Sequence, residues 1–309
     1  MHNNEIITKM LDGEVYSLAK VISIVESNSP DTGKIMQGIF PHCNGANVIG
    51  ITGPPGAGKS SVIYHLAKTI SDQSKKVAVL AIDPNSHVTG GALLGDRIRM
   101  DDLKDVYIRS IGNRCSMGGV SSSTYFIIKI LEACKYEYIF IETVGVGQSE
   151  VKIKDLADIT MLILAPGLGD DIQANKAGIM EIGDIIVVNK ADKPDALRLE
   201  MELKDMLKTS QHQNANAQVF QTDSINGLGF NKLVECFPSI ISKDNKTKEI
   251  EKLKTQYLEL MENKIITLVH NKFNSTEDID ETMEDVLNGE QNVIDLINKD
   301  IKDIISTNI

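Results

Sequence analysis

The stretch 53–60 constrains the fold of this chain more than any other part of the sequence. It reads Gly-Pro-Pro-Gly-Ala-Gly-Lys-Ser and matches the pattern G-x-x-x-x-G-K-[ST] at every fixed position. The apolar run 48–52 comes just before it, and apolar residues recur at helical spacing across 62–70. In a strand–loop–helix arrangement, backbone N–H groups and the helix N-terminus bind phosphate. The stretch therefore predicts a nucleoside triphosphate site.

Each polar residue of this stretch has an expected role. The Lys59 ammonium reaches the β- and γ-phosphates, which makes it a candidate catalytic residue, and the Ser60 hydroxyl binds Mg²⁺. The alternative is a glycine-rich turn without a ligand, but at average composition a chance match in a chain of this length is expected in only about one case in a hundred. The nucleotide-binding residues predicted here are Gly53, Pro54, Pro55, Gly56, Ala57, Gly58, Lys59, Ser60 and Ser61.

Apolar runs of strand length alternate with helical segments from residue 48 to about 237. Near-continuous apolar runs of this kind indicate a parallel sheet covered by helices on both faces. We expect an α/β P-loop NTPase with a mostly parallel sheet and helical extensions at both ends. After 48–52, the predicted strands are 76–83, 106–109, 138–143, 159–165, 185–189 and 218–222.

Three polar residues fall at the carboxyl ends of predicted strands, which is where such sheets bind ligands. They are Asp83, Glu142 and Asn189. Glu142 opens Glu-Thr-Val-Gly at the place where GTPases carry D-x-x-G, so we expect it to hold Mg²⁺ through a water and the Gly145 N–H to contact the γ-phosphate. Asp83 either caps a helix or, as its strand-end position favours, helps to bind the magnesium.

The segment Asn-Lys-Ala-Asp at 189–192 indicates that the base is guanine. The Asp192 carboxylate accepts hydrogen bonds from N1–H and the 2-amino group of guanine, whereas adenine offers neither donor. Each unpaired buried group costs about 1–3 kcal/mol, so two mismatches discriminate strongly. Lys190 is expected to lie along the base. Backbone donors of the segment after the last strand are expected to bind guanine O6, which adds Asp223, Ser224 and Ile225 to the nucleotide-binding residues.

Composition and charge limit the classes of partner that this chain is expected to bind. A net charge of −11 argues against a surface for nucleic acid or anionic membrane. The 4 cysteines form no C-x-x-C pair, which disfavours a zinc site or a disulfide framework. We find neither a secretory signal nor an apolar run long enough to cross a bilayer, and we expect a cytoplasmic protein.

Three parts are expected: an N-terminal helical extension over 1–45, a P-loop GTPase domain over 46–240 and a C-terminal helical arm over 241–309. The N-terminal helices cannot bury their apolar stripes alone and should pack against the main domain. The C-terminal stripes either complete the core or form a dimerisation arm. The second reading is favoured because the domain before them already looks complete.

Three segments carry a resemblance to one family. The segments 81–86, 90–100 and 142–150 resemble those of the MeaB/ArgK family, GTPases that chaperone adenosylcobalamin-dependent methylmalonyl-CoA mutase. The resemblance implies a homodimeric, Mg²⁺-dependent GTPase that binds GTP and GDP, gates cofactor loading onto a cobalamin mutase and protects the loaded enzyme. It also implies that Asp83, Asp96 and Glu142 surround the magnesium together with Ser60.

A further segment, 169–176, matches the extra switch loop of this family, which couples partner binding to hydrolysis. Asp170, Gln173 and Lys176 stand in the matching places. Because the motifs assign no arginine to catalysis, Lys176 is the candidate for the activating charge, with Gln173 or Asp170 helping to lock the loop. Arg97 and Arg99 are the alternatives.

The chain also departs from the family pattern. Ser121, Ser122 and Ser123 stand where basic residues usually follow the segment 114–120, and the segment 222–224 differs from the usual S-A-L. The partner is therefore methylmalonyl-CoA mutase or a relative that acts on another substrate. Three other functions were weighed: a transport-associated ATPase or kinase, a metallochaperone-type GTPase and a structural dimer module. Asn189 and Asp192 argue against the ATPase or kinase, and the scattered histidines argue against the metallochaperone. The intact Lys59 argues against the structural module.

Overall fold

The structure is a computed structural model that describes residues 2–27, 29–83, 103–112, 123–143, 153–168, 183–209, 217–241, 246–272 and 292–308. It divides into two compact units, Met1–Thr247 and Lys248–Ile309. Five of the predicted site residues lie outside the described residues: Asp96, Gly145, Asp170, Gln173 and Lys176.

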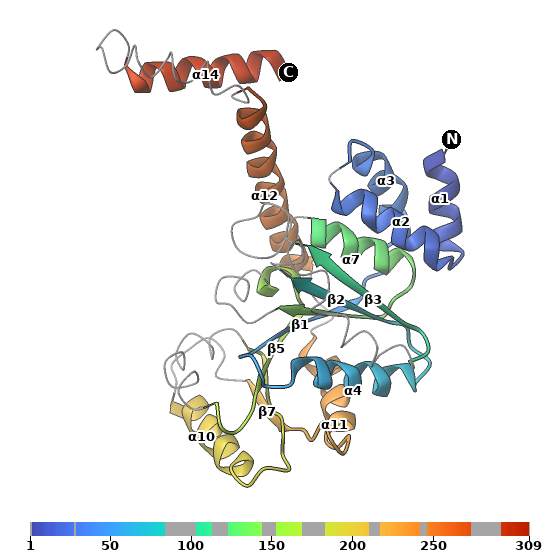
Figure 1. Cartoon of the computed structure of the whole chain (residues 1–309), viewed down its shortest axis with the longest axis vertical. Helices are drawn as coiled ribbons and strands as arrows, with labels where there is room; N and C mark the ends of the chain where they lie inside the picture. The colour runs from blue at the N-terminus through green and yellow to red at the C-terminus, as the bar shows by residue number, and fades with distance from the viewer. Residues whose placement is uncertain are drawn as a thin grey trace. The chain divides into compact units, whose positions relative to one another are not determined.

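The first unit is built on a 7-stranded sheet in the order β3-β2-β4-β1-β5-β6-β7 (Figure 1). Each neighbouring pair of strands is parallel. The strands are β1 (Asn47–Thr52), β2 (Val77–Asp83), β3 (Val106–Gly112), β4 (Tyr138–Thr143), β5 (Ile159–Leu164), β6 (Ile185–Val188) and β7 (Gln218–Gln221). The predicted parallel α/β sheet is confirmed. Its central strands β1, β4, β5 and β6 are buried on both faces and read as continuous apolar runs, whereas the edge strands β3 and β7 are partly exposed.

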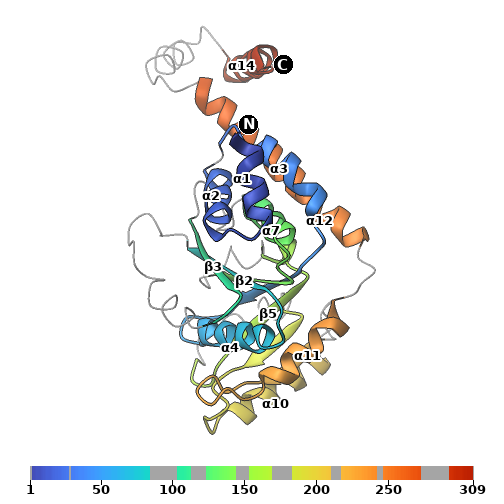
Figure 2. The same cartoon turned by 90° about the vertical axis from the view of Figure 1, so that its right-hand side faces the viewer.

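Helices cover both faces of the sheet, as predicted (Figure 2). Alternate residues of a strand point to opposite faces. On β4, for example, Ile139 and Ile141 belong to one buried cluster and Tyr138 and Phe140 to the other. The first face is covered by α1 (His2–Leu11), α2 (Val15–Glu26), α3 (Thr32–Ile39) and α7 (Ser123–Ala133), and the second by α4 (Lys59–Ser71) and α11 (Phe230–Ile240). The helix α10 (Ala196–Thr209) packs on β6 and β7.

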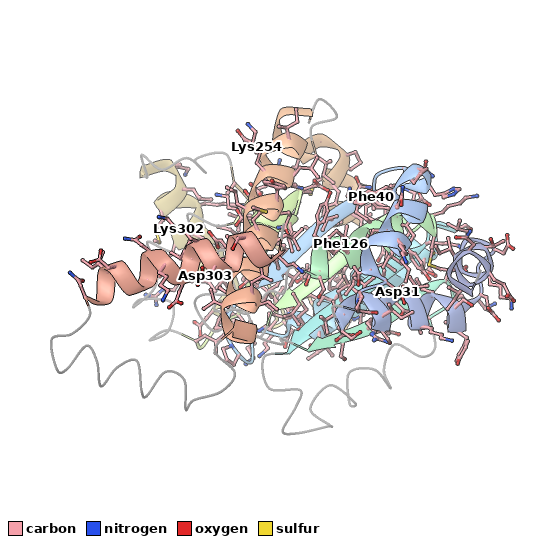
Figure 3. All side chains as sticks on the ribbon, turned by 90° about the horizontal axis from the view of Figure 1, so that it is seen from above. Asp31, Phe40, Phe126, Lys254, Lys302 and Asp303 are labelled. Atoms are coloured by element: carbon pink, nitrogen blue, oxygen red, sulfur yellow. The ribbon has the colours of Figure 1, made fainter. Side chains whose placement is uncertain are left out.

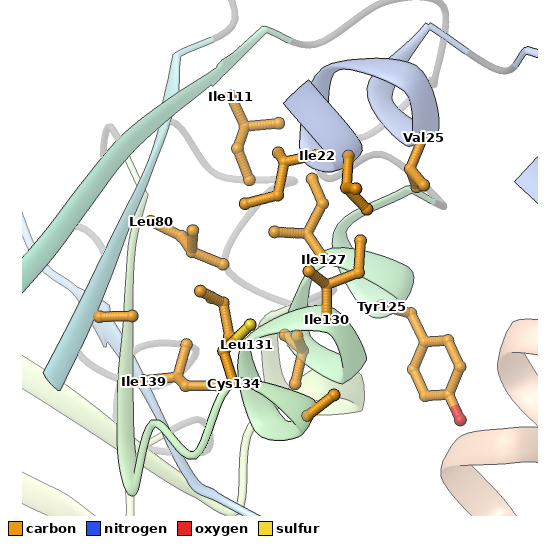
Figure 4. Packing of buried hydrophobic residues seen from close by; sticks show 14 of the residues in the cluster. Ile22, Val25, Leu80, Ile111, Tyr125, Ile127, Ile130, Leu131, Cys134 and Ile139 are labelled. Carbon is orange, nitrogen blue, oxygen red and sulfur yellow. The ribbon is translucent and has the colours of Figure 1, made fainter. Parts of the chain in front are cut away.

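The N-terminal helices are part of the first unit and pack on α7, as expected from their apolar stripes. One buried cluster joins α2, α7 and the sheet (Figure 4), and it includes Ile22, Val25, Ile127, Leu80 and Ile111. A short 3₁₀ turn, Phe40–His42, ends this region before β1.

The second unit holds most of α12 (Lys246–Lys272) and all of α14 (Val293–Asn308). Apolar side chains such as Tyr257 and Ile297 are exposed on these helices. Charged residues separate the apolar ones, among them Lys254 on α12 and Lys302 on α14 (Figure 3). A dimerisation arm over 241–309 stays a prediction. Among the described helices, none is both long and apolar enough to span a membrane.

Candidate nucleotide-binding site

The phosphate loop 53–58 joins the carboxyl end of β1 to the start of α4, as the strand–loop–helix pattern predicted. Its backbone conformation requires glycine at two positions. Gly53 has φ +145°, and a Cβ there would lie 2.2 Å from the carbonyl oxygen of Ile163. Gly58 has φ +91°, and a Cβ there would lie 2.5 Å from Nδ2 of Asn189. These glycines let the loop pass close to β5 and to the residue that follows β6.

Lys59, the first residue of α4, folds back across the phosphate loop. Its Nζ donates to the carbonyl oxygen of Gly53 at 2.8 Å and to that of Pro54 at 3.3 Å. The side chain is buried. The ammonium is thus held beside the loop whose N–H groups are expected to surround a phosphate, at the positive end of α4.

The segment after β6 donates two side-chain hydrogen bonds to the same loop. Asn189 Nδ2 donates to the carbonyl oxygen of Ala57 at 3.0 Å, and Lys190 Nζ donates to that of Gly56 at 2.7 Å. The C=O and N–H of a trans peptide point in opposite directions, so the bond to the Ala57 carbonyl turns the Gly58 N–H away from Asn189. Phosphate loop and base segment therefore form one connected structure.

Ser60 and Glu142, both predicted magnesium ligands, are brought together. Ser60 Oγ donates to Glu142 Oε1 at 3.0 Å. Glu142 lies on β4 in register with Ile51 of β1 and Ala81 of β2, and Asp83 ends β2 on the same edge of the sheet. Hydroxyl and carboxylate oxygens are the ligands that Mg²⁺ prefers, so this pair fits the ion.

Asp192 lies in a short turn, and its carboxylate is available as a hydrogen-bond acceptor. The N–H of Lys193 donates to the Lys190 carbonyl at 3.0 Å, and the N–H of Ala191 donates to the Thr222 carbonyl at 3.0 Å. The Asp192 side chain is exposed, and its carboxylate makes no hydrogen bond to another described residue. Guanine recognition by Asp192 requires an acceptor in this state.

Asn189 has a role that sequence reasoning missed. Besides its bond to Ala57, its Oδ1 accepts from Ser224 Oγ at 2.8 Å and from Thr222 Oγ1 at 3.2 Å. The side chain is 1% exposed. Asn189 thus braces the phosphate loop against the segment after β7, and its predicted contact with the nucleotide stays a prediction. In the sequence, the hydroxyl residues Thr222 and Ser224 are the feature that could have indicated this role of Asn189.

The segment after β7 differs in detail from the expected row of backbone donors. The N–H of Asp223 donates to the Leu228 carbonyl at 3.0 Å, and that of Ile225 donates to Asp223 Oδ1 at 2.9 Å. Of the three residues predicted here, Ser224 is the one whose N–H makes no hydrogen bond to another described residue. The predicted contact of this segment with guanine O6 stays a prediction, and the Ser224 N–H is the donor that remains for it.

The Asp223 carboxylate, for which no role was predicted, closes a turn. It accepts from the side-chain amide and the N–H of Asn226, at 2.6 and 3.1 Å. The amide hydrogen bond from the Asn226 side chain lowers the pKa of Asp223 most; the N–H groups of Asn226 and Ile225 and the nearby His65 add to this, while burial opposes it. The carboxylate is therefore a buried anion that holds its own loop together.

Comparison with known proteins places this site in a family. The family model described as "Methylmalonyl Co-A mutase-associated GTPase MeaB" matches residues 18–278. The chain belongs to the MeaB family. This match confirms the family that segments 81–86, 90–100 and 142–150 had indicated.

Relatives of this MeaB-family chain include proteins from archaea, bacteria and a mammal. A putative GTPase of Pyrococcus abyssi is 47% identical over 205 residues, which are 65% of this chain and 63% of that protein. GTPase ArgK of Escherichia coli is 38% identical over 61% of this chain and 59% of its own length. The mouse protein "Methylmalonic aciduria type A homolog, mitochondrial" is 42% identical over 52% of this chain and 40% of its own length. Each match covers less than two thirds of the relative.

A solved structure agrees over nearly the whole chain. The crystal structure titled "LAO/AO transport system kinase" has a TM-score of 0.68, with 22% identity, and the match covers 99% of this chain and 97% of that one. At this identity the likeness shows the fold alone. Together with the parallel sheet and phosphate loop, it confirms the predicted fold class.

Proposed function

We propose that this chain hydrolyses GTP to GDP and phosphate with Mg²⁺ and acts as a chaperone of an adenosylcobalamin-dependent acyl-CoA mutase, gating the loading and protection of its cofactor. The observation that carries the nucleotide part is the bracing of the phosphate loop by Asn189 and Lys190, which belong to the same Asn-Lys-Ala-Asp segment as the exposed Asp192. The mutase part is supported by the family description, which names a methylmalonyl-CoA mutase-associated GTPase.

The chemistry of the proposed reaction follows from the side chains that surround the phosphate loop. Lys59 would exchange its contact with the Gly53 carbonyl for phosphate oxygens, and the N-terminus of α4 would stabilise their negative charge. Ser60 and Glu142 would hold the magnesium ion, which neutralises charge on the phosphates when bound. Asp192 would pair with N1–H and the 2-amino group of guanine. The described residues thus bind and orient the nucleotide.

The charge that accelerates hydrolysis is proposed to come from Lys176, with Gln173 and Asp170 locking its loop; all three lie outside the described residues. A charge supplied to the transition state is worth about 10³–10⁵ in rate, so a site without one is slow until a partner delivers it. Arg97 and Arg99 are the alternatives. We further propose a homodimer, supported by the exposed apolar residues of α12 and α14, which sedimentation of the full chain tests.

The partner is tested by measuring GTP hydrolysis with and without a purified adenosylcobalamin-dependent methylmalonyl-CoA mutase. We expect the mutase to stimulate hydrolysis by about 10³-fold, the lower end of what an added catalytic charge provides. Lys176→Ala should lose most of this stimulation. Lys59→Ala measured beside it corrects for contaminating GTPases. No stimulation by this mutase or by a related acyl-CoA mutase would contradict the chaperone function.

Two further measurements test the two alternative functions. Hydrolysis of ATP in preference to GTP would favour a transport-associated ATPase or kinase. Stoichiometric binding of nickel that depends on GTP would favour a metallochaperone-type GTPase. Neither is expected, because Asp192 selects guanine and the described residues contain no cluster of histidine, cysteine and carboxylate side chains suited to a metal ion.

A further inference from the structure

His65 links the helix of the phosphate loop to the segment after β7. It lies on α4, the helix that Lys59 opens, and it is half-buried. Its Nε2 is 2.8 Å from the carbonyl oxygen of Ser224. Because a carbonyl oxygen only accepts hydrogen bonds, Nε2 must carry the proton and donate it. This contact joins residues 159 positions apart in the chain, and no sequence motif pointed to it.

Packing holds the imidazole of His65 in place. The ring stacks on Phe230 with centroids 4.7 Å apart and planes inclined by 19°. Tyr64 meets it edge-on at 5.2 Å. Gly227, with φ +69°, lies so close that a Cβ there would be 3.4 Å from the ring. The direction of the Nε2–H bond is therefore set by contacts independent of the hydrogen bond itself.

The hydrogen bond from His65 orients the backbone on one side of Ser224. The peptide that joins Ser224 to Ile225 is fixed by His65 on its carbonyl and by Asp223 Oδ1 on its N–H. The peptide before it is fixed by the Asp223 carbonyl, which accepts from the N–H of Leu228 at 3.0 Å. In a trans peptide the N–H points opposite to the C=O. The Ser224 N–H is therefore directed out of the turn that Asp223 closes.

We propose that His65 is a positioning residue for recognition of guanine O6, acting by anchoring the backbone of Ser224, whose N–H is the expected donor. The inference rests on the proposed function, because it presumes a guanine nucleotide at Asp192. The Leu228 N–H fixes the peptide that carries the donor, while Asn189 holds the Ser224 side chain and His65 holds its carbonyl. Asn189 also holds the phosphate loop, and His65 lies on the helix that follows it. The segment expected to recognise the base and the loop expected to bind phosphate are thereby held by the same part of the structure.

Two guanine analogues separate this contact from the one made by Asp192. In 6-thio-GTP a sulfur, which is a weak acceptor, replaces O6, while N1–H and the 2-amino group remain. In ITP the 2-amino group is missing and O6 remains. The first analogue reports on the Ser224 N–H and the second on Asp192. The measurement is the dissociation constant of GTP, 6-thio-GTP and ITP for the native chain and for variants of His65.

His65→Phe keeps an aromatic ring on Phe230 but removes the donor. We expect its affinity for GTP and for ITP to fall by the same factor, about tenfold, which is the loss of one well-placed hydrogen bond. Its affinity for 6-thio-GTP should fall by less than about twofold, because that analogue gained little from the Ser224 N–H. The preference for GTP over 6-thio-GTP therefore drops, and the preference for GTP over ITP does not.

His65→Gln is the matched rescue, because its side-chain amide can reach the Ser224 carbonyl, and it should restore the native preference for GTP over 6-thio-GTP. His65→Asn carries the same amide on a shorter side chain and should behave like His65→Phe, which supplies a second test if the phenylalanine variant does not fold. Thermal unfolding of each variant without nucleotide checks the fold.

Three results would decide against the inference. An equal loss of affinity for GTP and 6-thio-GTP would mean that His65 only supports the fold. An unchanged affinity for GTP would mean that the Ser224 N–H needs no such support. If native chain binds ATP as tightly as GTP, the proposed function fails and this inference fails with it; a native preference for GTP together with unaffected variants overturns the inference alone.

Discussion

Lys59→Ala is expected to lower the rate of GTP hydrolysis by a factor of about 10²–10³, the usual consequence of removing one charge-stabilising donor from a reaction centre. The Lys59 ammonium lies across the phosphate loop, 2.8 Å from the Gly53 carbonyl, on the loop where the β- and γ-phosphates are expected. Single-turnover hydrolysis at saturating GTP measures the effect on the chemical step rather than on binding.

The same substitution also affects the fold modestly. Because Lys59 is buried and bonded to two loop carbonyls, we expect the free energy of unfolding to fall by about 1–2 kcal/mol. Lys68→Ala, an exposed lysine later on the same helix, is the matched control and should change neither the rate nor the stability. Native hydrolysis by the Lys59 variant would contradict the phosphate-loop assignment.

Asp192→Asn is expected to weaken GTP binding by about 10²-fold and to make xanthosine triphosphate the better ligand. Hydrogen bonds to a charged group contribute about 1.5–3 kcal/mol each, and two of them are lost or inverted. Xanthine carries a carbonyl at C2, which pairs with the amide donor of asparagine. Because the Asp192 carboxylate is exposed and bonded to no other described residue, the exchange leaves no orphaned partner in the protein.

Equilibrium titration with GTP and xanthosine triphosphate measures this change of preference. Asp205→Asn, on the exposed face of α10, makes the same change of charge away from the site and should leave both affinities unchanged. If Asp192→Asn binds GTP as the native chain does, the guanine base is recognised elsewhere.

Local patterns predicted the parts of this structure that local physics determines. The central strands are recognisable because both their faces are buried, and the phosphate loop because its geometry demands glycine at 53 and 58. The strand ends were enough to bring Ser60 and Glu142 to one edge of the sheet. The N-terminal helices were expected to pack against the main domain because their apolar stripes need a partner.

Contacts between distant residues were not predictable from these patterns. Asn189 and Ala57 are 132 positions apart, and His65 and Ser224 are 159 apart. Neither pair leaves a periodic or compositional trace. The sequence likewise could not show that Asp223 turns its carboxylate to Asn226 and its N–H to Leu228, because a strand-end aspartate fits a ligand site and a turn equally well.

The choice between GTP and ATP by the native chain tests the central claim most directly. The measurement is competition of each nucleotide, with Mg²⁺, against a fluorescent GDP analogue bound to the full chain. Two mismatched groups on adenine predict that displacement needs about 10²- to 10⁴-fold more ATP than GTP. Displacement by ATP and GTP at the same concentration would contradict the assignment of Asp192 and, with it, the reading of this chain as a guanine nucleotide-binding protein.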